Sequence, residues 1–162
     1  MTERELSIVL RELACSQPTP LCGKWTEEWK DDADIDELLD KFIRGFDFCV
    51  KNDYPPLDFC RRNFKKEDLH RHNIFIDEEV QVADAENGYY VFLGECRGTV
   101  WVNGLKAVTI FVRHGSRIDV CAYDGARVQV RYYDHSEGVC KSDGYSKIKK
   151  CNNQKEIGRA HV

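Results

Sequence analysis

YYVFLGECRG TVWVNGLKAV TIFVRHGSRI DVCAYDGARV QVRYYD, residues 89–134, repeats one pattern every ten residues. Two positions, or slots, of this repeat are mostly apolar. The first slot holds Tyr90, Val100, Ile110, Val120, Val130 and Cys140, and the second holds Phe92, Val102, Val112, Ala122, Tyr132 and Ser142. A third slot holds Gly98, Val108, Ile118, Val128, Gly138 and Ile148, and the turns fall at Gly94, Gly104, His114, Asp124, Asp134 and Gly144. A fixed period of this kind is typical of stacked structural repeats.

The alternation of apolar and polar residues within each unit predicts strands centred near 91, 101, 110, 120 and 130. Two architectures satisfy this spacing. In a β-solenoid, two strands and their turns form a coil of about twenty residues, so that slots twenty apart stack. An antiparallel β-meander is the alternative. A meander requires only that apolar and polar residues alternate, and does not require columns of one chemical class. The sequence favours the β-solenoid because whole columns keep their chemical class.

The first half of the chain predicts helices. Thr2 and Glu5 have the spacing of a capping box, and a short helix follows to about Ala14. Gln17-Pro-Thr-Pro20 breaks the chain, and Asp34 is the expected cap of a long helix over 35–51. Pro56 is placed to begin another short helix, and a further helical turn is expected over Lys66–His72. Extended structure then begins at Ile74-Phe-Ile76.

These patterns predict an α+β protein. Residues 1–75 form a helical cap or docking domain, residues 76–150 form the β-repeat domain, and 151–162 form a tail. Ile157-Gly-Arg-Ala-His-Val162 matches the translation of a common sequencing adapter, so we expect it to be adapter read-through on a truncated frame. It is excluded from fold reasoning.

Charge differs between the two halves. Residues 1–60 contain fourteen acidic and seven basic side chains, whereas residues 89–156 contain seven acidic and eleven basic ones. The repeat half is therefore mildly basic, with a net charge of +4, which is compatible with an anionic partner. This charge is much smaller than a dedicated nucleic-acid binder carries, and an ordinary solvated surface also accounts for it. The start Met-Thr-Glu-Arg-Glu-Leu and the absence of a long apolar run predict a cytoplasmic protein, and its eight cysteines are expected to be reduced thiols.

The segment Val112-Arg-His-Gly-Ser-Arg-Ile-Asp-Val120 resembles a rung of the β-solenoids of bacterial surface and phage-associated proteins. Over roughly residues 20–150 the chain is similar to uncharacterised proteins of gut Bacteroides and their prophages, which have a helical N-terminal part and such rungs. The resemblance implies a phage or mobile-element setting, with a virion-associated location as one form of it. Its motifs are structural and carry over no catalytic residue.

Chemically suggestive residues do not assemble into a reactive site. His70 and His72 lie two apart on a short helix and point to different faces, and Cys15 and Cys22 belong to no CxxC pair. Asp134-His135-Ser136 has the residue types of a hydrolase triad, but adjacent side chains diverge, so a turn is expected. His114 also falls in a turn slot. We expect no enzyme activity, no cofactor and no metal.

The remaining candidate is a binding surface. A basic column is expected at Arg97, Arg117, Arg127 and Lys147, with Arg113 and Arg131 nearby. Outward slots hold Trp101, Phe111, Tyr123 and Tyr133. Guanidinium groups and aromatic rings together can bind sugars, bases, phosphates or carboxylates. The alternative for Trp101 and Phe111 is packing against the helical half.

The resulting hypothesis is a non-enzymatic structural or binding module. Its favoured partners are another protein or a second copy, through the open end of the solenoid, with nucleic acid or glycan as alternatives and no membrane. The alternative function is an intracellular regulator that binds nucleic acid or a host protein through the basic column.

Overall fold

The computed structural model describes residues 1–18 and 23–153, apart from the side chains of Thr26 and Asn153. The chain divides into two compact units, Met1–His72 and Asn73–Val162. The first strand begins at Ile74, so the boundary lies slightly before the one expected from the sequence. The expectations for Cys22, Pro20 and Ile157–Val162 fall outside the described residues.

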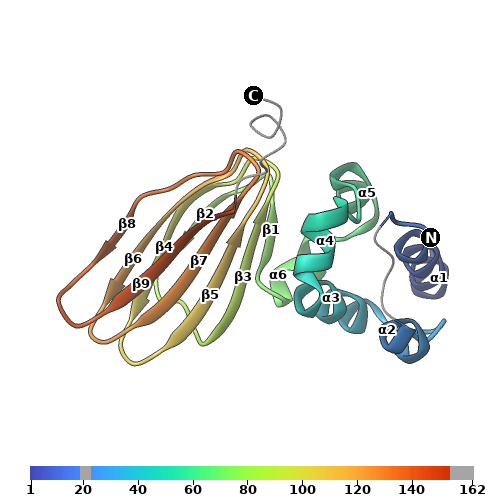
Figure 1. Cartoon of the computed structure of the whole chain (residues 1–162), viewed down its shortest axis with the longest axis horizontal. Helices are drawn as coiled ribbons and strands as arrows, with labels where there is room; N and C mark the ends of the chain where they lie inside the picture. The colour runs from blue at the N-terminus through green and yellow to red at the C-terminus, as the bar shows by residue number, and fades with distance from the viewer. Residues whose placement is uncertain (19–22, 154–162) are drawn as a thin grey trace. The chain divides into compact units, whose positions relative to one another are not determined.

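The first unit contains six described helices (Figure 1): α1 (Glu3–Cys15), α2 (Gly23–Glu28), α3 (Ile35–Arg44), α4 (Phe46–Asn52), α5 (Leu57–Asn63) and α6 (Lys66–Arg71). The expected caps are confirmed, since the Thr2 side chain accepts from the Glu5 N–H and Asp34 Oδ1 accepts from the Glu37 N–H at 2.9 Å. Apolar side chains of α1, α3 and α4 share a core with Trp29 and Tyr54. The Tyr54 hydroxyl donates to the Leu10 carbonyl at 2.8 Å within this core.

The single helix expected over 35–51 is wrong, because the structure has α3 and α4 in its place. Gly45 separates them with φ −100° and ψ 27°. Its N–H still bonds to the Lys41 carbonyl at 2.9 Å, so the chain bends without losing this bond. Glycine is the weakest helix former after proline, which explains why the apolar pattern does not hold one helix together here.

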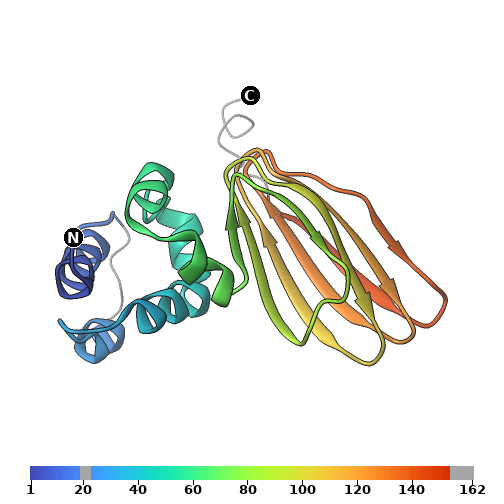
Figure 2. The ribbon, with the colours of Figure 1, turned by 180° about the vertical axis from the view of Figure 1, so that it is seen from behind.

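The second unit is a parallel β-solenoid of about four coils (Figure 2). Its strands are β1 (Ile74–Ile76), β2 (Glu79–Val82), β3 (Gly88–Leu93), β4 (Arg97–Asn103), β5 (Ala107–Val112), β6 (Arg117–Tyr123), β7 (Arg127–Tyr133), β8 (Cys140–Ser142) and β9 (Lys147–Asn153). Sheet A has the order β1-β3-β5-β7-β9, and sheet B has the order β2-β4-β6-β8. All pairs are parallel, so the solenoid is confirmed and the meander is wrong.

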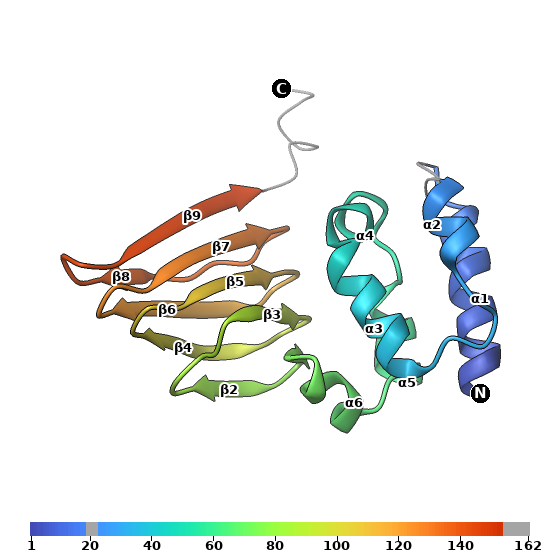
Figure 3. The same cartoon turned by 90° about the horizontal axis from the view of Figure 1, so that it is seen from below.

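The core lies between the two sheets, whose strands stack in two layers (Figure 3). Tyr90, Ile110 and Val130 pair in register across sheet A, while Val100 and Val120 do so across sheet B. Each column that repeats every ten residues in the sequence therefore divides into two columns that repeat every twenty residues, one on each sheet. The expected apolar slots of the central coils are buried in this core.

Side chains from one coil cap the backbone of the preceding coil at the turns. The Ser146 hydroxyl accepts from the N–H groups of Gly125 and Ala126, both at 3.0 Å, and the Ser116 hydroxyl accepts from the Cys96 N–H at 3.0 Å. His114, Asp124 and Asp134 occupy turns with φ near 60°, which favours glycine, asparagine and aspartate. The expected turn slots are confirmed, but the buried serines Ser116 and Ser146 were not predicted, because serine is a polar residue.

The β6–β8 ladder is interrupted at Gly138. Ile118 N–H bonds to the Glu137 carbonyl, but the Ile118 carbonyl accepts from the Tyr132 hydroxyl at 2.6 Å. The Val139 N–H, which a regular parallel ladder would give to Ile118, donates to Asp119 Oδ1 at 2.8 Å. Strand β8 begins only at Cys140.

The inward slots of the last described coil are mostly polar. Cys140, Ser142, Lys150 and Asn152 stand in register with Val120, Ala122, Val130 and Tyr132 of the coil before. The Lys150 ammonium lies 5.4 Å from the centre of the Tyr132 ring and donates to the Gly138 carbonyl at 2.8 Å. The apolar character of these slots is therefore largely lost in the last described coil.

Candidate functional site

The basic column expected from the sequence is wrong as a single feature, because it lies on two sheets. Arg97 and Arg117 pair in register on sheet B, whereas Arg127 and Lys147 pair in register on sheet A. One coil contains two strands, so residues ten apart face opposite sides of the solenoid.

The sheet B arginines are accompanied by carboxylates. Arg117 forms an ion pair with Glu137 at 2.8 Å, and Glu79 stands in register with Arg97. Arg97 also donates to the Gly115 carbonyl at 2.7 Å. Trp101 and Tyr123 lie on this same sheet. Because a carboxylate flanks the two arginines at each end of the column, it offers little net attraction to an anion.

Arg113 and Tyr133 are buried, with 3% and 4% of their surfaces exposed. Arg113 Nε lies 3.0 Å from Asp134 Oδ2, which also accepts from the His114 N–H at 3.0 Å. Burial alone would raise the pKa of Asp134, but the His114 N–H and the charge of Arg113 outweigh it and hold the pKa below its ordinary value. This group stabilises a turn of the solenoid. Because Arg113 and Tyr133 are buried, both side chains have little exposed surface for a partner.

The outer side of sheet A carries positive charge and no acidic side chain among its described strand residues. None of the residues of β1, β3, β5, β7 and β9 is aspartate or glutamate. Arg127, Arg131, Lys147 and Lys149 alternate with inward residues and so point outward. The charges of the solenoid are therefore segregated, with both signs on sheet B and only cations on the described strands of sheet A.

A shallow concavity of about 550 Å³ lies over sheet A. We call six of its lining residues the basic face: Tyr89, Thr109, Arg127, Gln129, Lys147 and Lys149. Four of them form one straight register column across β3, β5, β7 and β9, in the order Tyr89, Thr109, Gln129, Lys149. Arg127 and Lys147 form a second column beside it. Of this set, the sequence predicted only Arg127 and Lys147. The twenty-residue spacing of 89, 109, 129 and 149 is the signal that marks the other four residues.

An aromatic pair lies at one end of the basic face. The Tyr89 and Phe111 rings are nearly parallel, at an interplanar angle of 5° with their centres 6.0 Å apart. The Arg131 guanidinium lies 6.0 Å from the centre of the Phe111 ring. Phe111 is buried, whereas 48% of Tyr89 is exposed. Tyr89 therefore presents a supported aromatic ring to a partner.

Asp134-His135-Ser136 forms a turn as expected, and Ser136 donates to the Val112 carbonyl at 2.8 Å. His114 also acts in a turn, where its Nδ1 accepts from the Gly94 N–H at 2.9 Å. Ser136 Oγ and His114 Nδ1 are therefore both engaged in turn contacts. Across the described residues, no three histidine, cysteine or acidic side chains group to hold a metal.

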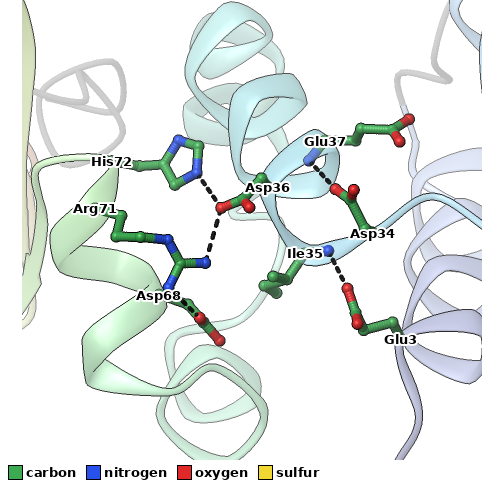
Figure 4. Close-up of polar contacts among 8 residues, drawn as sticks. All are labelled: Glu3, Asp34, Ile35, Asp36, Glu37, Asp68, Arg71 and His72. Carbon is green, nitrogen blue, oxygen red and sulfur yellow. Dashed lines mark hydrogen bonds and ion pairs between the residues drawn. The ribbon is translucent and has the colours of Figure 1, made fainter.

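An exposed ion-pair cluster joins α3 to α6 in the helical unit (Figure 4). Asp36 Oδ1 lies 2.8 Å from His72 Nε2 and 2.9 Å from an Arg71 nitrogen, and Arg71 also pairs with Asp68 at 2.7 Å. Hydrogen bonds from His72 and Arg71 hold the pKa of Asp36 below its ordinary value. The cluster connects two helices that are distant in sequence, which is why sequence analysis missed it.

A small apolar cavity of about 40 Å³ lies in the helical core, between Trp25, Trp29, Phe48 and Tyr54. A water molecule needs about 10–15 Å³ measured this way, so the cavity has room for only a few waters. Lys41 covers part of it, with its ammonium 5.3 Å from the centre of the Trp25 ring. It is a packing space of the core.

No protein-family model matches the chain. The comparisons with curated proteins and with solved structures gave no match either. The described part of the chain contains no helix with the length and apolar character needed to cross a membrane. The physical character of the surfaces is therefore the basis for a functional assignment.

Proposed function

We propose that this protein is a non-enzymatic binding module whose basic face holds a negatively charged polymer. The observation that carries the proposal is the segregation of charge, since the described strands of sheet A bear no carboxylate and their outward cations lie in adjacent strands. Exposed ion pairs are individually weak, so several contacts along a polymer are needed for useful affinity.

Binding to a phosphate polymer through this face should depend strongly on salt. If Arg127, Lys147 and Lys149 each contact one phosphate, the affinity for a single strand falls about twentyfold between about 50 and 200 mM NaCl. Fluorescence anisotropy with labelled heparin and with an oligothymidylate of about twelve nucleotides measures this dependence. We expect the double variant Lys147→Glu, Lys149→Glu to bind either polymer about tenfold or more weakly than the unmodified protein.

The matched control reverses two charges on the other sheet, as Arg97→Glu, Arg117→Glu. Packed sheets lie about 10 Å apart, which is about a Debye length at 0.1 M salt, so this variant should bind nearly as well as the unmodified protein. Circular dichroism spectra verify that both variants are folded. Equal losses in the two variants, or no salt-sensitive binding to either polymer, would refute the role of the basic face.

We further propose a phage or mobile-element setting and a cytoplasmic or virion-associated location. The resemblance of the rungs to phage-associated solenoids supports the setting, and the seven described cysteines are thiols, as expected in a reducing compartment. Recovering the uninterrupted reading frame and its neighbouring genes tests this proposal. Neighbouring virion or mobility genes support it, and a run of housekeeping genes contradicts it.

A further inference from the structure

We infer that the polymer bound by the basic face is single-stranded nucleic acid, with a base stacked on Tyr89. This inference rests on the proposed function, because it names the class of polymer that the same face takes. It is carried by the combination of an exposed aromatic ring, uncharged hydrogen-bonding groups and cations in adjoining columns of one sheet.

The Tyr89 ring is held in place for stacking. It lies parallel to the buried Phe111 ring, and the Arg131 guanidinium contacts the other ring of this pair. A ring that is supported by its neighbours loses little conformational freedom when a base stacks on it. Every base has an aromatic face, so such a platform does not require a particular sequence.

The column that begins at Tyr89 matches the chemistry of a nucleotide chain. Thr109 and Gln129 follow Tyr89 with uncharged donors and acceptors that can reach base edges, and Lys149 ends the column with a cation. Four adjacent strands span about 14 Å. At a rise of about 3.4 Å per nucleotide, this is the length of about four stacked nucleotides.

The cations lie where they can follow the backbone of such a chain. Arg127 and Lys147 form the column next to Thr109 and Gln129, on the two strands nearest Lys149. Phosphates therefore have partners on one side of the bases. A sulfated glycan or polyphosphate would use these cations equally, but neither has a base to occupy Tyr89. An acidic peptide carries carboxylates for the cations but needs neither the ring nor the amide.

The experiment compares two probes of matched charge. One is a labelled oligothymidylate of about twelve nucleotides, and the other is an abasic deoxyribose phosphate chain of the same length. We expect the unmodified protein to bind the oligothymidylate about tenfold more tightly than the abasic chain at physiological salt. Tyr89→Ala should remove this preference and leave the affinity for the abasic chain unchanged, whereas Tyr89→Phe should keep it.

Other outcomes separate this inference from the proposed function. Equal, salt-sensitive binding of both probes would overturn the inference and leave the proposed function intact. Tighter binding of polyglutamate than of either probe would overturn the inference in favour of an acidic protein partner. If no polymer binds, both fail. Tyr89 is exposed, so its variants should fold normally, and thermal melting of each variant verifies this.

Discussion

At the scale of single residues, the fold has room only for glycine at position 138. A Cβ atom at this position would lie 1.7 Å from the Ile118 carbonyl oxygen and 2.4 Å from the Tyr132 hydroxyl. Both atoms belong to the hydrogen bond that replaces a ladder bond between β6 and β8. Burial raises the pKa of Tyr132, so its hydroxyl keeps the proton that it donates. The absence of a side chain at Gly138 therefore makes room for the hydrogen bond that interrupts the ladder.

Gly138→Ala should lower the free energy of unfolding of the solenoid by about 3 kcal/mol, because backbone and a buried hydroxyl must both move. Urea denaturation measures the loss. Gly144→Ala is the matched control, since a Cβ there meets nothing within 4 Å, and it should change stability by less than about 0.5 kcal/mol. If the two variants are equally stable, the account of the interrupted ladder is wrong.

At the scale of elements, the turns bind each coil to the next. Asp134 accepts from the backbone of the preceding coil and pairs with a buried arginine, and Ser146 caps two N–H groups of the coil before it. These groups satisfy backbone donors where the ladders stop, which a buried corner requires. The order of the coils is thus maintained by polar turns as well as by the apolar core.

The Asp134 carboxylate should make this corner sensitive to acid. Its folded pKa is lowered, so its stabilisation is complete above the pKa of an unfolded aspartate, about 3.9, and is lost as the pH falls through the folded value. Asp134→Asn should therefore reduce stability by about 2 kcal/mol at pH 7, and this difference should shrink below about pH 4.

Chemical denaturation at neutral and acidic pH checks this dependence. Asp124→Asn is the control, because Asp124 occupies another turn, is exposed, and has a φ of 60°, close to the 59° of Asp134. Asparagine tolerates this conformation, so the control should be nearly neutral at both pH values. A difference between Asp134→Asn and the unmodified protein that stays constant with pH would disprove the ionic role of Asp134.

At the scale of the whole molecule, two cores stabilise two units. Among the described residues, the apolar cluster of the first unit lies within residues 6–64, and that of the second unit lies within residues 75–148. Units with separate cores can unfold separately. We expect two transitions in calorimetry, one for each unit.

Val120→Asp should abolish or strongly lower the transition of the solenoid and leave that of the helical unit in place. Val120 is fully buried, so an aspartate there places an unpaired carboxylate in the core at a cost of several kcal/mol. Calorimetry and hydrogen exchange of each unit measure the effect. Val139→Asp is the control, since Val139 is 46% exposed. A single transition that shifts as a whole would show that the units unfold together.

The sequence predicted the solenoid because apolar slots such as Ile110 and Val120 recur in both sheets. A ten-residue period does not show which of the two sheets a residue belongs to. The sequence therefore predicted Arg117 and Arg127 on one surface, although they lie on different sheets. The break at Gly45 was missed because the apolar stripe of α3 continues into α4. The Asp36 cluster depends on the approach of α3 and α6, which no local pattern contains.

The lysine in the inward column of the last described coil restricts which surfaces can stack on that coil. Lys150 stands where Val130 stands one coil earlier, and its ammonium donates to the Gly138 carbonyl. A neighbouring segment or molecule that covered this coil with a purely apolar face would enclose the charge without a partner, at a high cost in stability. Anything that packs here must therefore bring an acceptor or a carboxylate to meet the ammonium, so the lysine selects its neighbours by their polarity.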